Sequence, residues 1–147
     1  MFHKLVDSTL AFIPGAQSLI EVLSQKGVLI ALVTSGTPNY VFSFLNKHQI
    51  TKRFQSIVTM ADVELHKPCP DPYVKALELT SLNPNESIAI EDSPTGVISA
   101  QKAKIPCVFI DDGETKLASG SDNLFRVKDL KSVDVQLLNK LYKKHNA

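Results

Sequence analysis

The chain has 147 residues, a net charge of +1 and an ordinary globular composition, 44% hydrophobic and 21% charged. Its length fits one domain with a two- or three-layer core. The balanced charge leaves no basic stripe and argues against nucleic acid as the main partner, and no apolar run approaches the roughly 20 residues that span a membrane. Cys69 and Cys107 match no metal-ligand spacing, which favours free thiols and a reducing, cytoplasmic location.

Helix and strand patterns alternate along the first half of the chain. Apolar residues at helical spacing predict a helix over Ala16–Lys26. The all-apolar run Val28–Val33 follows, and such a run is typical of a strand that is buried on both faces. Thr37-Pro38 then opens a second helix, and Ile57–Met60 predicts a further short strand.

The second half of the chain repeats this alternation. Alternating strands and helices predict parallel β–α–β units, and therefore a single α/β domain, residues 1–147, with a doubly wound parallel sheet and helices on both faces. The predicted elements are a helix from its cap Asp71 to Leu79, a strand Ile88–Ile90, a helix after Ser93-Pro94, strands Cys107–Ile110 and Leu124–Val127, and an amphipathic C-terminal helix.

Two adjacent carboxylates, Glu91 and Asp92, follow the buried strand Ile88–Ile90 and precede a helix start at Ser93-Pro94. In an open α/β sheet, ligands bind at the carboxyl ends of the strands. Two acids at that place, with no basic partner in the local sequence, predict a site for a divalent cation such as Mg²⁺, which takes oxygen ligands. The alternative is that Asp92 only caps the helix and Glu91 is a solvated loop acid.

Groups suited to phosphate follow the earlier strands. Thr34 and Ser35 offer hydroxyls and backbone N–H groups at a helix start, which is an anion site. Lys67 lies in a proline-stiffened loop and offers a point charge. Alone, Thr34 is equally well a strand-ending cap and Lys67 a surface lysine. Together with Glu91 and Asp92 they are the parts that phosphoryl transfer needs, and we predict that they converge on one rim of the sheet.

These motifs, in this order, resemble those of the haloacid dehalogenase superfamily, and within it the phosphoglycolate phosphatase and β-phosphoglucomutase-like group. Leu32–Ser35 is similar to the second motif of the family, Lys67–Tyr73 to the third, and Ile90–Ser93 with Gly96 to the fourth. The resemblance implies a Rossmann-like core and a magnesium-dependent phosphatase or phosphomutase that acts on a small phosphorylated metabolite.

The resemblance also implies a role for each residue of the candidate site. Thr34 and Ser35 hold the phosphoryl group, and Lys67 binds it as a catalytic residue. Glu91 and Asp92 hold Mg²⁺.

The first motif of the family, Asp-x-Asp-Gly-Thr with its aspartate nucleophile, is missing. Its nearest look-alike, Leu5–Leu10, has leucine where the nucleophile belongs, and residues 1–13 are interpreted as the remnant of a linker to a cap domain. Losing a covalent nucleophile costs on the order of a millionfold in rate, so we expect this chain to be inactive alone. The alternative function is a non-catalytic module that binds a phosphorylated ligand or a protein. A receiver-type signalling domain fits poorly, because its acids precede its lysine.

The same omission predicts a missing strand between Val28–Val33 and Ile88–Ile90. Two open edges would leave several buried backbone groups unbonded, at about 1–3 kcal/mol each, against a total stability of about 5–15 kcal/mol. We therefore expect that the two strands close up, that Phe2–Val6 fills the position, or that another chain does. The last two options favour self-association or a complementing chain.

Overall fold

The computed structural model describes residues 12–117 and 122–147, in which strands and helices alternate. The strands are β1 (Ala31–Val33), β2 (Ser56–Val58), β3 (Ala89–Glu91), β4 (Cys107–Ile110) and β5 (Leu124–Val127). The α-helices are α2 (Ala16–Gln25), α3 (Pro38–Lys47), α4 (Asp71–Thr80), α5 (Pro94–Lys102) and α6 (Val135–His145). Short 3₁₀ turns lie at Thr51–Arg53, Met60–Asp62, Pro84–Glu86 and Leu130–Ser132. No helix among the described residues combines the length and the apolar character that crossing a bilayer requires.

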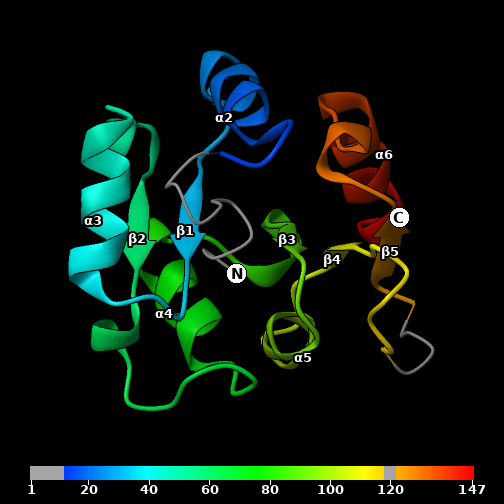
Figure 1. Ribbon diagram of the computed structural model, residues 1–147. Helices are drawn as coiled ribbons and strands as arrows, with labels where there is room; N and C mark the ends of the chain where they lie inside the picture. Colours follow the sequence, from blue (N-terminus) through cyan, green and yellow to red (C-terminus); the bar gives the residue numbers. More distant parts are fainter. Residues whose placement is uncertain (1–11, 118–121) are drawn as a thin grey trace.

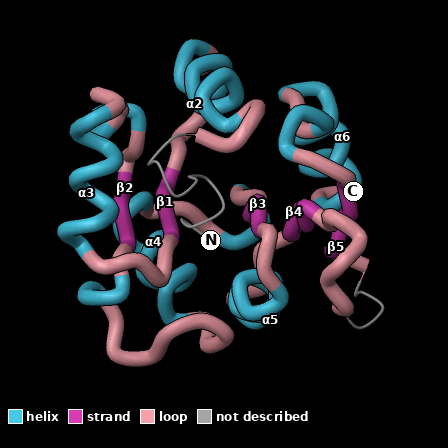
Figure 2. The backbone as a smooth tube through the Cα atoms, viewed as in Figure 1, coloured by secondary structure: helices cyan, strands magenta, loops and turns pink. Residues whose placement is uncertain are grey.

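Helices cover both faces of the strands (Figure 1, Figure 2). Consecutive residues of β1 point to opposite faces: Leu32 packs in a cluster with Val41 and Phe44 of α3, whereas Val33 packs in a cluster with Ala76 of α4. The helices α2 and α6 lie on the same face as α3, and α5 lies with α4 on the other. All described strand pairs are parallel. The predicted α/β, doubly wound arrangement is confirmed.

The sheet is divided into two parts. β1 pairs with β2, and β3, β4 and β5 pair in that order, while no ladder joins β1 to β3 within the described ranges. A cavity of about 370 Å³, here named the central cavity, lies between these two strands. The expectation that the two strands close up is therefore wrong, since this cavity separates their facing edges. The second option, Phe2–Val6, lies outside the described residues.

The first strand is shorter than its apolar run. Val28 and Leu29 are 46% and 48% exposed, so the prediction of a strand buried from Val28 onward is wrong. The cause is the end of α2: Gly27 adopts a left-handed conformation, and the N–H of Val28 donates back to the carbonyl of Leu23 at 3.0 Å. Val28 thus completes the helix end instead of starting the strand.

The two proline-marked helix starts differ in detail. Ser93 is the N-cap of α5, and its hydroxyl accepts the N–H of Gly96 at 3.2 Å, which confirms the predicted cap. At α4 the cap position is Pro70, and Asp71 is already the first helical residue, so the expected Asp71 cap is wrong. Asp71 still lies in the first turn, where its charge suits the positive end of the helix dipole.

Candidate active site

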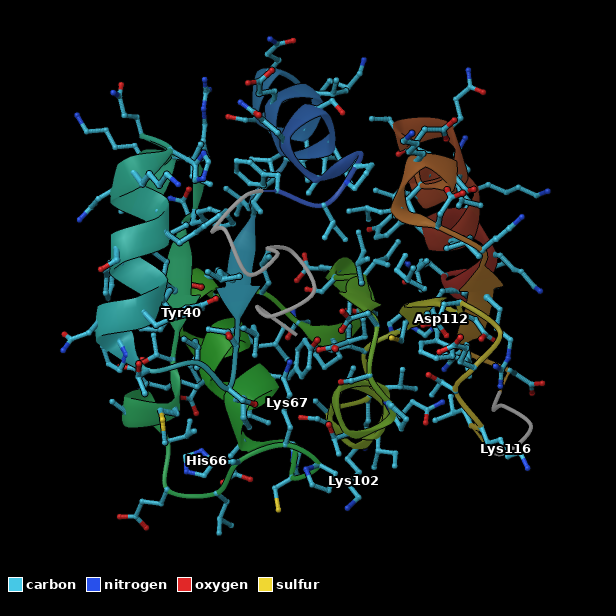
Figure 3. All side chains as sticks on the ribbon, viewed as in Figure 1. Tyr40, His66, Lys67, Lys102, Asp112 and Lys116 are labelled. Carbon is cyan, nitrogen blue, oxygen red and sulfur yellow. The ribbon has the colours of Figure 1, made fainter. Side chains whose placement is uncertain are left out.

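Lys67 lies at the rim where β1 and β3 end, between the two parts of the sheet (Figure 3). Its ammonium group donates to the carbonyl of Val33 at 3.0 Å and to Oε1 of Glu91 at 2.5 Å. Because these residues are the last of β1 and of β3, one side chain joins the carboxyl ends of both strands. The Lys67 and Glu91 side chains are only 2% and 0% exposed. The alternatives of a surface lysine and a solvated loop acid are therefore excluded.

Glu91 is held by more than its ion pair. The hydroxyl of Tyr73 also donates to Oε1 of Glu91, and the Lys67 ammonium lies 5.2 Å from the centre of the Tyr73 ring. Burial raises the pKa of Tyr73 well above its ordinary value of 10.0, and the nearby charge of Glu91 raises it further. Tyr73 is therefore a neutral donor to the carboxylate.

The second carboxylate oxygen of Glu91 faces the backbone of α5. A Cβ atom built on Gly96 would lie 1.9 Å from Oε2 of Glu91, so this position in the first turn of α5 has room only for glycine. Oε2 has no hydrogen-bond partner among the described residues. The start of α5 thus approaches the buried carboxylate of Glu91 closely.

Thr34 directly follows Val33, the residue whose carbonyl Lys67 binds, and it is buried at 3% exposure. Its N–H donates to the carbonyl of Val58 at 2.9 Å, and its Oγ1 accepts the N–H of Gly36 at 3.0 Å. A hydroxyl that accepts one bond retains its own proton for donation. Thr34 therefore caps its turn and can still donate to an anion at the rim. Ser35, beside it, is exposed.

Asp92 directly follows Glu91, is buried at 7% exposure and lines the central cavity. The N-cap of the next helix is Ser93, so Asp92 is not the cap residue. Mg²⁺ is commonly held by one or two carboxylates, substrate phosphate and water, and Asp92 offers a hard oxygen donor of this kind. No group of three or more His, Cys, Asp and Glu side chains occurs among the described residues, so protein ligands alone do not make a closed metal cage there.

The structure brings together Thr34, Lys67, Glu91 and Asp92 at the shared rim of β1 and β3, as the geometric prediction requires. Their roles toward phosphate and metal remain predictions. For Glu91 the structure adds a specific contact: its Oε1 already accepts two donors, from Lys67 and Tyr73. The basic partner that the local sequence lacks is thus Lys67, which is 24 residues away.

The sequence analysis placed Tyr73 and Gly96 within the third and fourth motifs but assigned neither residue a role at the site. A signal was present for Gly96, because glycine inside a helix costs stability relative to alanine and usually marks a close approach. For Tyr73 the only signal was general, since a buried tyrosine normally finds a partner for its hydroxyl. The partner itself lies 18 residues away and depends on the fold.

Residues 1–110 match the family model described as haloacid dehalogenase-like hydrolase, which is well over half of the chain. The chain belongs to this family. Its structural neighbours lie in the β-phosphoglucomutase and phosphoglycolate phosphatase group, as the sequence motifs predicted. The family relationship and the fold therefore agree.

Two curated relatives carry phosphatase names. The chain is 33% identical over 96 residues to validoxylamine A 7'-phosphate phosphatase of Streptomyces hygroscopicus, a match that covers 65% of this chain and 45% of that protein. It is 34% identical over 93 residues to hexitol phosphatase A of Escherichia coli, which covers 62% of this chain and 42% of that protein. The matched region thus spans less than half the length of these relatives.

Solved structures share the fold over most of this chain. The β-phosphoglucomutase of Clostridium difficile superposes with a TM-score of 0.74 at 19% identity, covering 92% of this chain and 58% of that one. CbbY of Rhodobacter sphaeroides, determined in complex with phosphate, gives a TM-score of 0.72 at 25% identity and covers 82% and 55%. The chain therefore corresponds to little more than half of these folds.

Proposed function

We propose that this chain is the core of a magnesium-dependent phosphatase or phosphomutase that acts on a small phosphorylated metabolite. The observation that carries the proposal is the position of Lys67, whose buried ammonium group binds Val33 and Glu91, the residues directly before Thr34 and Asp92. The phosphatase names of the relatives support the reaction class. The free cysteines Cys69 and Cys107 support a reducing, cytoplasmic setting.

Each residue at the rim has a chemical task in this proposal. The Lys67 ammonium group offsets the negative charge of the phosphoryl oxygens, while its bonds to Glu91 and Val33 keep it in place. The hydroxyl of Thr34 and the backbone at Ser35 donate to the same oxygens. Asp92 would hold Mg²⁺, which supplies further charge neutralisation when bound. Glu91 acts mainly by positioning Lys67.

We further propose that the chain by itself does not turn over substrate, because its sequence contains no Asp-x-Asp-Gly-Thr motif. Both carboxylates at the rim have other tasks: Glu91 accepts from Lys67 and Tyr73, and Asp92 is assigned to the metal. Without a covalent nucleophile, the rate falls by about a millionfold even where binding persists. Activity then requires a nucleophile from a further polypeptide segment.

Calorimetry with inorganic phosphate and MgCl₂ tests the binding half of the proposal. We expect saturable binding by the native chain and binding weaker by about 10-fold or more in Lys67→Met, because a charge-assisted hydrogen bond is lost. Lys102→Met, which changes an exposed lysine of α5, is the matched control and should bind as the native chain does. Equal affinity in all three proteins would contradict the proposal.

An assay with p-nitrophenyl phosphate and MgCl₂ tests the catalytic half. The chain alone should show no turnover above background. Turnover that disappears in Asp92→Ala would show that the chain carries its own nucleophile, and would refute the claim of inactivity. The second candidate function is a non-catalytic module that binds phosphate, and the absence of the first motif supports it. Phosphate binding without turnover, even after a nucleophile-bearing segment is supplied, would favour this candidate.

A further inference from the structure

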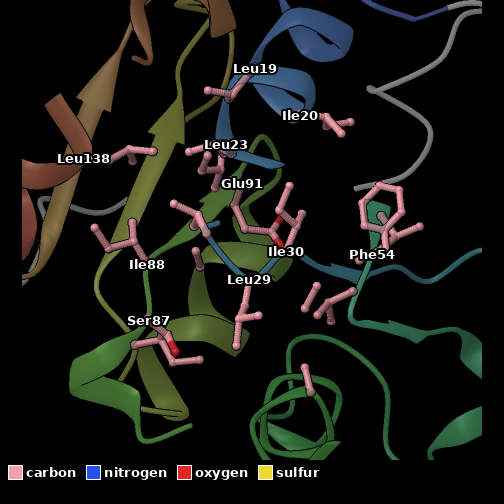
Figure 4. A pocket seen from close by; sticks show the side chains of 18 of the residues that line it. Leu19, Ile20, Leu23, Leu29, Ile30, Phe54, Ser87, Ile88, Glu91 and Leu138 are labelled. Carbon is pink, nitrogen blue, oxygen red and sulfur yellow. The ribbon is translucent and has the colours of Figure 1, made fainter. Parts of the chain in front are cut away.

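The loop that carries Lys67 determines whether its ammonium group reaches the rim. Lys67 belongs to the segment between the 3₁₀ turn Met60–Asp62 and α4, residues 63–70, here named the Lys67 loop. Glu91, its anionic partner, lines the central cavity (Figure 4), whereas Lys67 approaches Glu91 from the loop. The position of the ammonium group therefore depends on where the backbone of this loop is held.

The end of the Lys67 loop has few backbone donors of its own. Pro68 and Pro70 have no N–H group, and the N–H of Cys69 donates to the carbonyl of His66 in the same loop at 2.8 Å. Residues 68–70 thus have no backbone N–H left for a neighbouring element. A hydrogen bond that joins this part of the backbone to another element needs a donor from that element.

Ser99 of α5 supplies such a donor. Its hydroxyl donates to the carbonyl of Cys69, 30 positions earlier in the sequence, at 2.5 Å. Among the residues that the structure describes, this is the one hydrogen bond that joins the backbone of residues 66–69 to another helix or strand. Cys69 lies two residues after Lys67, so the bond holds the loop close to its lysine.

The surroundings of Ser99 favour a hydrogen-bonding role over a packing role. Its side chain is 0% exposed in the middle of α5. A serine or threonine in a helix can donate to a carbonyl of its own helix, as Thr80 does to Ala76 in α4 at 2.8 Å, whereas Ser99 donates to the Lys67 loop. Alanine has the higher helix propensity, and a buried hydroxyl without a partner costs free energy. The bond to the loop is therefore the interaction that the serine provides at this position.

The same face of α5 also supports the anionic partner of Lys67. Gly96 precedes Ser99 by three positions, so the two residues lie on one face of the helix. At Gly96 the helix backbone closely approaches the carboxylate of Glu91, which binds Lys67. The ion pair, the helix α5 and the bond from Ser99 to Cys69 thus form a closed ring of contacts that includes Lys67.

We propose that Ser99 is a positioning residue of the candidate phosphate site. Its hydroxyl holds the Lys67 loop against α5, so that the ammonium group of Lys67 stays at the ends of β1 and β3. The inference deepens the proposed function and rests on it, because phosphate is the ligand that this ammonium group would bind. Ser99 acts through Lys67, since its own proton is already donated to Cys69.

Two serine-to-alanine variants separate this role from a general effect of a lost hydroxyl. Ser99→Ala removes the bond to the loop and leaves the charge of Lys67 unchanged. The matched control is Ser56→Ala in β2, because Ser56 is also buried, at 8% exposure, and its hydroxyl has no hydrogen-bond partner among the described residues. Circular dichroism should show the native fold for both variants, since each change removes only an oxygen atom.

Trace acetylation with acetic anhydride, followed by mass spectrometry, reports whether the amine of Lys67 is held in place. The Lys67 side chain is 2% exposed and should react slowly in the native chain and in Ser56→Ala. Ser99→Ala should raise its rate by about fivefold, the effect of one lost hydrogen bond. The exposed Lys143 of α6 should react at the same rate in all three proteins.

Amide hydrogen exchange at Val108, which is 0% exposed in β4, distinguishes local release of the loop from global unfolding. Exchange in the core requires opening of the whole fold, whereas a loop can open by itself. In Ser99→Ala, the exchange rate at Val108 should therefore rise by less than the acetylation rate of Lys67. A merely structural role of Ser99 would raise both rates by the same factor.

Calorimetry with inorganic phosphate and MgCl₂ reports the consequence for the site. Ser99→Ala should bind phosphate about fivefold more weakly than the native chain. The ammonium group is still present in this variant, but the conformation that is competent to bind is less populated, and the apparent affinity falls by that fraction. Ser56→Ala should bind phosphate as the native chain does.

Faster acetylation of Lys67 together with weaker phosphate binding supports the proposal. An unchanged acetylation rate, or a rise that exchange at Val108 matches, would overturn it, because Ser99 would then not hold the loop specifically. Faster acetylation with unchanged phosphate affinity would also overturn it, since the position of Lys67 would not matter to the ligand. If the native chain itself does not bind phosphate, the proposed function fails, and the acetylation rates alone then decide whether Ser99 positions Lys67.

Discussion

Two ion pairs of similar length occupy opposite environments in this protein. Lys67 and Glu91 are 2.5 Å apart and almost fully buried, with exposures of 2% and 0%. Arg126 and Asp111 are 2.7 Å apart beside β4 and β5, with side-chain exposures of 37% and 23%. The distance between the charges is similar, and their access to water differs.

The difference in burial shows which of the two ion pairs contributes to the tertiary structure. Removing two charges from water is costly and is offset only where further hydrogen bonds satisfy them. Glu91 has the hydroxyl of Tyr73 and Lys67 has the carbonyl of Val33 for this purpose. The exposed pair needs no such support and gains little from its attraction. The buried pair therefore joins the two parts of the sheet, whereas the exposed pair is a surface feature.

Removing the cation of the buried pair should have the largest effect. Lys67→Met leaves the Glu91 carboxylate buried without its counter-ion, and we expect the free energy of unfolding to fall by about 3–5 kcal/mol in urea denaturation. The double variant Lys67→Met with Glu91→Gln should recover much of this loss, because no buried charge remains. A loss below about 1 kcal/mol in the single variant would make this pair equivalent to a surface pair.

Tyr73→Phe removes one donor to Glu91 and keeps the ring. The free energy of unfolding should fall by about 1.5–3 kcal/mol at pH 7, the usual range for a hydrogen bond to a charged group. The variant should also change the alkaline limb of the stability profile. Because the folded pKa of Tyr73 is raised above 10.0, the unfolded chain loses this proton first, and stability falls as pH rises above about 10.

This alkaline loss amounts to at most about 1.4 kcal/mol per pH unit for one group. Urea denaturation between about pH 9 and pH 11 should show a shallower decline in Tyr73→Phe than in the native chain. Tyr142→Phe, at an exposed residue of α6, is the control and should follow the native profile. Parallel profiles for the native chain and Tyr73→Phe would contradict the claim that burial and the charge of Glu91 raise the pKa of Tyr73.

Gly96→Ala tests the close contact on the other side of Glu91. Alanine normally stabilises a helix interior by about 1 kcal/mol relative to glycine. Here its Cβ would overlap Oε2 of Glu91, and we expect a net destabilisation of about 1–3 kcal/mol from overpacking. Thermal unfolding measured by circular dichroism decides the sign, and a stabilised variant would show that Glu91 is free to move away.

Asp111→Asn, in the exposed pair, should have the smallest effect. The pKa of Asp111 is lowered from its ordinary value of 3.8, mainly by the hydrogen bond from the N–H of Gly113 and secondly by the hydrogen bond from the Arg126 side chain. The Asp111 carboxylate therefore contributes to stability above pH 3.8, and this contribution is lost as the pH falls through the lowered pKa of the folded state. Thermal unfolding at pH 7 in about 1 M salt should not distinguish the variant from the native chain. A loss of stability as large as that expected for Tyr73→Phe would contradict the conclusion that the exposed ion pair contributes little.

The elements of the fold were largely predictable because they depend on local patterns. β4 and β5 have the bounds that their apolar runs predict, and the Ser93 cap follows from its own short motif. The errors occurred where a neighbouring element intervened. Val28 and Leu29 have the apolar character of strand residues, but the N–H of Val28 donates to the carbonyl of Leu23 at the end of α2.

The placement of the candidate site residues was predictable from the sequence, whereas their contacts were not. Parallel strands end at one edge, so the placement of Thr34, Lys67 and Asp92 at one rim follows from the alternation of strands and helices. The sequence could not indicate that Glu91 is the counter-ion of Lys67, because the two lie on separate elements. It also could not indicate that Tyr73 donates to the same oxygen.

By itself the sequence determined the order of strands and helices, the second to fourth family motifs and the absence of an Asp-x-Asp-Gly-Thr motif, because each of these depends on a short stretch of residues. Tertiary structure alone decided that β1 and β3 stay apart around a cavity and that one lysine joins their ends. The physical reason is that burial and long-range pairing are properties of packed layers. A side chain acquires its partner only when elements distant in the chain are brought together.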